Sequence, residues 1–111
     1  MEIQEQRQGA VTVLKPCGPL ILGDATEFGQ RLGEVVTRSL GRLVVDASGV
    51  AYVDSTGLET LVAATEEMAA GGRALRLCGA NETVREVLDL TGLSDRFEHY
   101  EDLTTAVRSF L

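Results

Sequence analysis

The chain has 111 residues, 44% of them hydrophobic and 5% aromatic, which suits one domain with a mostly aliphatic core. Its formal net charge is −7, with nine arginines and one lysine scattered along the sequence. This argues against nucleic acid as a partner, because phosphate contacts need clustered basic residues. No apolar run approaches the roughly 18 residues of a membrane span, and the polar N-terminus is unlike a signal peptide.

The first elements in the chain are expected to form an antiparallel hairpin. Residues 2–7 are polar with one apolar anchor, Ile3, which is typical of an edge strand. Gln8-Gly9 offers a turn, and residues 10–14 are expected to form the second strand. The prolines and the glycine in residues 15–19 are expected to end this pattern.

A helix and a buried strand follow. Asp24, with Glu27 three residues later, forms the aspartate version of a capping box and predicts where the helix begins. Gly41 is a plausible end, and residues 43–47 form a continuous apolar run that is typical of a strand with neighbours on both sides. Apolar residues recur at helical spacing at Ala25, Phe28, Leu32, Val35 and Val36.

Residues 53–59, Val-Asp-Ser-Thr-Gly-Leu-Glu, allow two interpretations. In the first, Thr56 and Glu59 form a capping box for the next helix, worth about 1 kcal/mol. In the second, Ser55 is a site of modification, because α/β proteins meet ligands and partners at this end of their strands. A phosphate there would lie near the positive end of a helix dipole. It would add about −1.5 to −2 charge beside Asp54, enough to repel a partner.

Gly57 is expected to leave the backbone open to close approach by another chain. The helix that follows is expected to end at Gly71-Gly72. Its apolar face is predicted to consist of Leu58, Leu61, Val62, Met68 and Ala69.

The remaining chain alternates strands and helices. Residues 74–79 are expected to form a strand, and Asn81 to cap a helix that Gly92 ends. Residues 96–100 form a short last strand, and Asp102 begins a last helix. The order β-β-α-β-α-β-α-β-α predicts an α/β domain, residues 1–111, with a mostly parallel sheet of about five strands, an N-terminal hairpin and four helices.

Catalytic and metal-binding patterns are missing from the sequence. It has no GxxxxGK[ST], no GxGxxG and no GxSxG motif. Cys17 and Cys78 have no metal-binding spacing and are expected to be free thiols of a cytoplasmic protein. His99 is the only histidine, and the acidic residues show no ligand pattern. We therefore expect no enzyme activity, no cofactor and no metal.

Two stretches resemble a known family. Residues 43–79, LVVDASGVAYVDSTGLETLVAATEEMAAGGRALRLCG, resemble the core of a STAS domain, as in bacterial anti-sigma factor antagonists. The matching parts include the strand, the aromatic Tyr52, the VDSTG turn and the helix that ends in Gly-Gly. Residues 84–107 resemble the C-terminal part of that family. The resemblance covers essentially the whole chain and implies a single STAS-type domain.

The resemblance implies a switch. In the antagonists, the serine after the aspartate of this turn is phosphorylated by an anti-sigma factor that is also a kinase, and only the unphosphorylated form binds that partner and frees the sigma factor. The matching position is Ser55, with Asp54, Thr56 and Gly57 as its neighbours. Thr56 is then expected to cap the helix, with Ser55 one step outside the cap and facing solvent. The implied partner is a GHKL-type serine kinase.

One segment departs from the family pattern. Many antagonists have Gly-Glu-Leu-Asp after the second strand, whereas residues 18–21 here are Gly-Pro-Leu-Ile, with no acid until Asp24. We expect the partner to contact the turn and the start of its helix, the adjoining loop, and apolar side chains where relatives use acids. The expected contact residues are Leu58, Glu59, Asp24, Pro19 and Ile21. The alternative is an accessory structural STAS subunit of a transport or signalling complex, in which Ser55 is only a cap.

Overall fold

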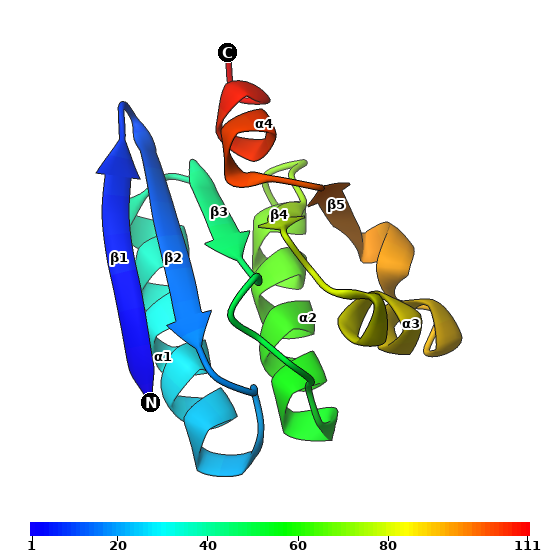
Figure 1. Cartoon of the computed structure of the whole chain (residues 1–111). Helices are drawn as coiled ribbons and strands as arrows, with labels where there is room; N and C mark the ends of the chain where they lie inside the picture. The colour runs from blue at the N-terminus through cyan, green and yellow to red at the C-terminus, as the bar shows by residue number, and fades with distance from the viewer.

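The computed structural model describes all 111 residues and places helices on both faces of one five-stranded sheet (Figure 1). The strand order is β1-β2-β3-β4-β5, so neighbours in sequence are neighbours in space. β1 and β2 are antiparallel and each later pair is parallel. The predicted α/β class, the hairpin and the four helices are therefore confirmed.

The elements have the following bounds. The strands are β1 (Glu2–Gln8), β2 (Val11–Cys17), β3 (Leu43–Asp46), β4 (Leu75–Cys78) and β5 (Phe97–Tyr100). The helices are α1 (Leu22–Arg38), α2 (Ser55–Ala69), α3 (Glu82–Leu90) and α4 (Leu103–Arg108), with a short 3₁₀ helix, η1 (Ser94–Arg96), before β5. None of these helices is long and apolar enough to cross a bilayer.

β2 is longer than its sequence pattern predicts. The strand continues through Pro16 to Cys17 and pairs with β1 along its whole length. Its pairing with β3 ends at Leu14. Pro16 therefore lies where β2 has lost one of its neighbours, and a residue without an N–H group is tolerated there.

The core has two parts, one on each face of the sheet. The larger part contains apolar side chains of α1, α2 and α3 and includes every predicted core residue of α1. The smaller part lies under α4, which packs on the opposite face (Figure 1). Its buried members are Val11, Val44, Cys78 and Ala106.

The predicted apolar face of α2 is only partly correct. Leu61 and Met68 are buried as expected, but Ala69 is exposed. A polar residue, Thr65, is buried instead. Its hydroxyl donates to the carbonyl of Arg96 at 2.7 Å and accepts from the N–H of Leu75 at 3.1 Å. Thr65 can be buried because both bonds satisfy its hydroxyl.

The predicted start of α1 is wrong. The helix begins two residues before Asp24, and its N-cap residue, Ile21, provides no side-chain hydrogen bond. Asp24 and Glu27 instead lie 3.3 and 3.4 Å from the N-terminal ammonium group of Met1. The caps of α3 and α4, in contrast, are the predicted residues Asn81 and Asp102, each accepting an N–H at 2.8 Å.

Candidate functional site: the Asp54–Gly57 turn

Two loops meet where α1 and α2 begin. The N–H of Leu20, after β2, donates to the carbonyl of Tyr52 at 3.1 Å, and the N–H of Asp54 donates back to the carbonyl of Leu20 at 3.2 Å. These bonds form a small parallel bridge between Leu20 and Val53. The loop after β2 is therefore fixed against the turn that precedes α2.

Asp54 is the residue that caps α2. One carboxylate oxygen accepts from the N–H of Gly57 at 2.8 Å, and the other accepts from the N–H of Leu22 at 2.9 Å. The prediction that Thr56 caps this helix is wrong, because the extended residue before the helix is Asp54 and Thr56 already lies in the first turn. One carboxylate thus serves the first turns of two helices.

The hydrogen bonds from Gly57 and then Leu22 hold the pKa of the Asp54 carboxyl below its ordinary value of 3.8. Backbone N–H groups lower the pKa in this way because they stabilise the charged form. Asp54 is therefore ionised at neutral pH. A fixed negative charge stands directly beside Ser55 in the chain.

Ser55 is the first residue of α2 rather than a residue outside the cap, which corrects its predicted position. Its side chain is exposed, as expected, and its hydroxyl makes no hydrogen bond within the chain. Thr56 differs, because it is half-buried and lines a groove between α1 and α2. Of the two hydroxyls in the turn, that of Ser55 is the one open to a modifying enzyme.

Gly57 is buried, and the structure gives a different reason for the glycine from the predicted one. A Cβ atom at this position would overlap the carbonyl oxygen of Leu20 and lie 3.1 Å from the Cβ of Leu20. The close approach is therefore made by the protein's own loop after β2, not by another chain. The glycine allows the two loops to meet at the cap.

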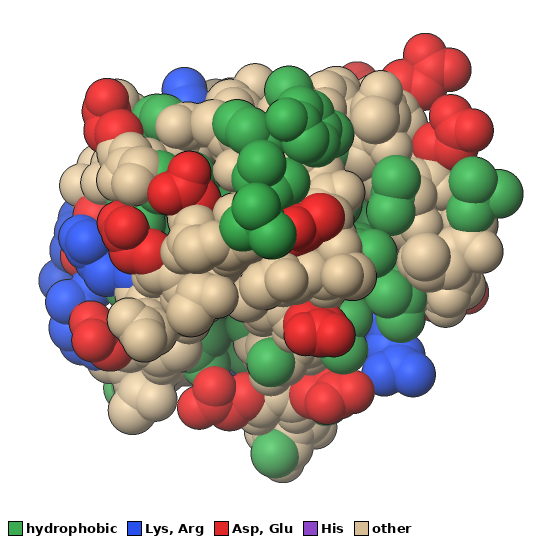
Figure 2. Space-filling view, turned by 90° about the horizontal axis from the view of Figure 1, so that it is seen from below, with side chains coloured by type: hydrophobic (Ala, Val, Ile, Leu, Met, Phe, Trp, Pro, Cys, Tyr) green, Lys and Arg blue, Asp and Glu red, His purple; other side chains and the backbone are tan.

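Apolar side chains surround the turn on the same end of the molecule. Leu22 is 69% exposed and Tyr52 is 48% exposed, while Pro19 and Ile21 are half-buried. Figure 2 shows this end, with hydrophobic side chains gathered near its centre and acidic side chains around them. Sequence reasoning missed Leu22, although three consecutive apolar residues after Pro19 could not all be buried in one loop.

Leu22 also has an unusual backbone conformation. Its φ angle is +49°, in the left-handed region that a leucine rarely adopts. The hydrogen bond from its N–H to Asp54 holds it there. Strained backbone residues are enriched at functional sites, and this one places a large apolar side chain in solvent next to the turn.

The other expected contact residues lie in different surroundings. Leu58 is half-buried and packs against the main core, which leaves it little surface for a partner. Asp24 is exposed beside the N-terminus. Glu59 is exposed and lines the groove between α1 and α2.

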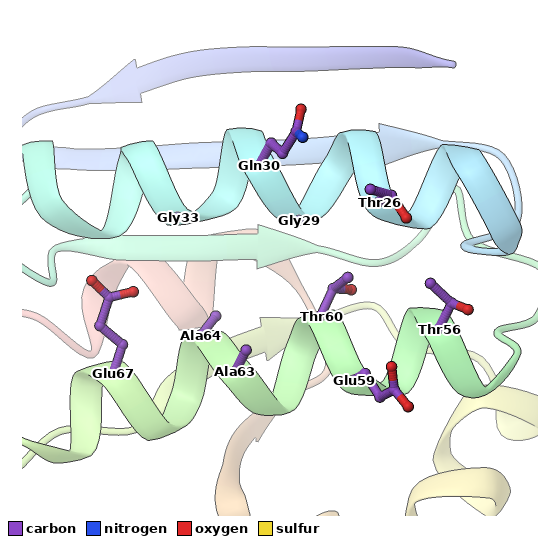
Figure 3. Close-up of a pocket in the computed structure, with 10 residues that line it drawn as sticks. All are labelled: Thr26, Gly29, Gln30, Gly33, Thr56, Glu59, Thr60, Ala63, Ala64 and Glu67. Carbon is purple, nitrogen blue, oxygen red and sulfur yellow. The ribbon is translucent and has the colours of Figure 1, made fainter.

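This groove is an open depression of about 480 Å³ (Figure 3). Small residues let the two helices approach closely, since a Cβ on Gly29 would lie 2.7 Å from Cγ2 of Thr60. Thr56 and Thr60 project from α2 toward α1 in Figure 3. Its lining residues are mostly small or polar, and only two of the ten are hydrophobic.

The remaining chemically active side chains form no second centre at this turn. No group of three or more His, Cys, Asp or Glu side chains is placed to hold a metal ion. Cys17 and Cys78 are both free, as predicted. Burial, together with the charge of Asp46, raises the pKa of the Cys78 thiol to about 12. The side chain of His99 forms hydrogen bonds only with Ser94, at 2.9 Å from its carbonyl oxygen and 3.2 Å from its hydroxyl, and its ring packs edge-on with that of Phe97.

Several solved structures share this fold. One is a candidate anti-sigma factor antagonist from Thermotoga maritima, with 23% identity, a TM-score of 0.87 and coverage of 96% of this chain and 92% of that one. Another is an anti-sigma factor antagonist from Mycobacterium paratuberculosis, with 26% identity, a TM-score of 0.81 and coverage of 97% and 92%. The phosphorylated form of SpoIIAA from Bacillus covers 99% and 100%, with 15% identity and a TM-score of 0.72.

The same fold also occurs in a different setting. The murine anion transporter Slc26a9 matches over 95% of this chain but only 18% of its own, with 20% identity and a TM-score of 0.72. At sequence identities below 25%, structural matches show that the fold is shared but do not show that the function is. The model of the STAS domain family matches residues 2–106. STAS domains are protein-interaction modules. The chain therefore belongs to the STAS domain family.

Proposed function

We propose that this protein is an anti-sigma factor antagonist whose binding to a partner is switched by phosphorylation of Ser55. When Ser55 is unmodified, the end of the molecule that carries the turn binds an anti-sigma factor, which releases its sigma factor. The expected partner is a GHKL-type serine kinase. The proposal places the chain in the cytoplasm, and its two free thiols suit a reducing compartment.

The observation that carries this proposal is the state of the Ser55 hydroxyl. It is exposed and unbonded at the first position of α2, while the cap role belongs to Asp54. A serine that has no structural duty is free to be modified without loss of the fold. SpoIIAA, which has the same fold, has been solved in a phosphorylated form, and this supports the proposal.

The local charges explain why a phosphate would disturb binding rather than folding. Asp54 already satisfies the N–H of Gly57, so the positive end of α2 is partly neutralised before any phosphate arrives. A phosphate would bring about −1.5 to −2 further charge. That charge would add to the acidic side chains already around the apolar patch (Figure 2). A partner's apolar contact with this end would be blocked by a hydrated phosphate, and its acidic side chains would be repelled.

The first test uses the GHKL-type serine kinase encoded nearest to this gene. After incubation with that kinase and ATP, intact-mass analysis should show one added phosphate, and peptide mapping should place it on Ser55. Ser55→Ala should remove the modification, whereas Thr56→Val should retain it. Phosphate on Thr56, or none on either residue, would contradict the proposal.

The second test measures binding to the same kinase. Ser55→Ala should bind as the wild type does but should not be released by ATP, and Ser55→Asp should bind weakly. If both variants bind like the wild type, Ser55 is no switch. The alternative, an accessory structural subunit such as the STAS domain in a transporter, predicts that outcome.

A third test addresses the surface. Leu22→Asn should weaken partner binding with little loss of stability, since asparagine tolerates the left-handed conformation. Leu40→Asn is a matched control, because Leu40 is 73% exposed and has a φ angle of +55° but lies just beyond the other end of α1. Equal effects of the two substitutions would argue against a contact at the turn.

A further inference from the structure

The end of the molecule opposite Ser55 contains a hollow of about 440 Å³, formed by the β1–β2 hairpin and the C-terminal end of α1. α1 has 17 residues, so this end lies about 25 Å from the turn at a rise of about 1.5 Å per residue. The polar side chains that line the hollow are Glu5, Arg7, Thr12, Arg38, Ser39 and Arg42.

Basic residues gather at this end, although they are scattered along the sequence. Arg42 lines this hollow and two adjoining ones. Together the three hollows are lined by six of the ten basic residues of the chain but by only two of its seventeen acidic side chains, Glu5 and Glu98. The six are Arg7, Arg38, Arg42, Arg73, Arg76 and Arg108. A chain of net charge −7 therefore has one distinctly basic end.

Two of the arginines in the first hollow have no carboxylate partner. Glu5 lies 2.6 Å from Arg38 and 3.1 Å from Arg31, and these ion pairs use its charge. Arg7 and Arg42 form no ion pair. The hollow thus retains two positive charges that nothing in the chain neutralises.

The backbone brings these side chains together. Arg7 lies directly opposite Thr12 in the β1–β2 register, so their side chains share one face of the sheet. The N–H of Thr12 donates to the carbonyl of Arg42 at 2.9 Å, where β2 meets the start of β3. Strand pairing therefore brings the backbones of Arg7, Thr12 and Arg42 together at this end of the sheet, and all three residues line the hollow.

Two hydroxyl side chains line the same hollow. Thr12 is only 6% exposed as a residue, but its hydroxyl is not among the buried polar atoms without a partner. The hydroxyl oxygen of Ser39 is buried without a partner. Buried polar groups are nearly always hydrogen-bonded, so the unsatisfied hydroxyl of Ser39 points to a missing ligand or water.

We infer that this hollow binds a phosphate-type anion, held by the guanidinium groups of Arg7 and Arg42 and by the hydroxyls of Thr12 and Ser39. Guanidinium groups form paired, charge-assisted hydrogen bonds with phosphate oxygens, and the hydroxyls supply further donors. The donors converge in one hollow, which suits a compact anion. The inference is independent of any role of Ser55, because the two ends share no residue.

The test is a titration of ¹⁵N-labelled protein with inorganic pyrophosphate in 150 mM NaCl, followed by NMR. The amide signals of Ser39, Gly41 and Arg42 should shift and saturate, while that of Ser55 stays in place. Arg7→Gln and Arg42→Gln should each raise the Kd by about tenfold, since each removes a charged hydrogen-bond donor. Shifts that do not saturate would overturn the inference.

A matched control separates a built site from general charge. Arg85→Gln removes the same charge from α3, where Arg85 lines a different hollow, and should leave the Kd unchanged. Thr12→Val keeps the charge and shape but removes the hydroxyl, and should raise the Kd by about threefold. If Arg85→Gln weakens binding as much as Arg42→Gln does, or if Thr12→Val has no effect, no site exists in the hollow.

A second arm identifies the source of the phosphate group. The protein is sedimented with phosphatidylcholine vesicles that contain phosphatidylglycerol. If the protein sediments with these vesicles and the Arg42→Gln variant does not, the site binds a lipid headgroup. Saturable binding of pyrophosphate without sedimentation would assign it to a soluble phosphate compound. Binding to neither probe would refute the inference.

Discussion

Gly57→Ala tests the claim that the protein's own loop, rather than a partner, requires a glycine in the turn. Gly57 lies inside the first turn of α2, where alanine would normally be more favourable by about 0.5–1 kcal/mol. Here the new Cβ would overlap the carbonyl oxygen of Leu20 and lie 3.2 Å from its carbonyl carbon. Leu20 must then move, although its carbonyl accepts from Asp54 and its side chain is buried.

We expect the overlap to outweigh the helical preference. Forcing an extra methyl group into a packed site costs about 1–3 kcal/mol, and the helical preference for alanine offsets about 0.5–1 kcal/mol of this. From the middle of these ranges, the net loss of unfolding free energy should be about 1 kcal/mol. For a domain of this size, 1 kcal/mol corresponds to about 4 °C or more in Tm. Urea and thermal unfolding followed by circular dichroism would measure both quantities.

Two glycines of α1 provide controls. A Cβ on Gly33 has no atom within 4 Å, so Gly33→Ala should raise stability by about 0.5–1 kcal/mol. A Cβ on Gly29 meets only the side chain of Thr60, at 2.7 Å, and should give an intermediate result because a side chain can rotate away. The reasoning is refuted if Gly57→Ala is as stable as the wild type or more so.

Three further predictions concern acid stability, thiol reactivity and a buried hydroxyl. The folded-state pKa of Asp54 lies below its ordinary value, so its contribution is present above that value and is lost as the pH falls through the folded-state pKa. Asp54→Asn, which can still cap, should therefore lose less stability between pH 7 and pH 3 in urea unfolding than the wild type, and an equal loss would contradict the cap. Iodoacetamide at pH 8 should alkylate Cys17 well before Cys78, because the Cys78 thiol is buried and has a pKa of about 12. Mass spectrometry of digests would measure the order, and alkylation of Cys78 first would contradict this prediction. Thr65→Val should lower the unfolding free energy by about 2 kcal/mol, because it leaves two backbone groups without their partner, and a change below about 0.5 kcal/mol would disprove that role.

Local signals in the sequence predicted the parts of the fold that depend on neighbouring residues. Asn81 and Asp102 cap the helices that begin one residue later, so a pattern of a few residues contains all the necessary information. The apolar face of α1 was also predictable, because its spacing is regular and one side of the helix meets the sheet.

The details of the turn depend on residues that are distant in sequence. The N–H of Leu22 is satisfied by Asp54, 32 residues later, and this contact moves the start of α1 away from the predicted capping box. The need for a glycine at position 57 likewise depends on the close approach of Leu20. The basic end could not be predicted from net charge, since the strands and helices collect arginines from separate parts of the chain.

The shared carboxylate of Asp54 has a thermodynamic consequence. The Asp54 carboxylate accepts hydrogen bonds from both Leu22 and the first turn of α2. A partner's contact with Leu22 and a charge on Ser55 therefore both act on the segment that this carboxylate holds together. Their effects on partner affinity should then be non-additive in a double-mutant cycle of Leu22→Asn and Ser55→Asp. The loop after β2 and the start of α2, which belong to different elements, would respond to a partner and to a kinase as one coupled element.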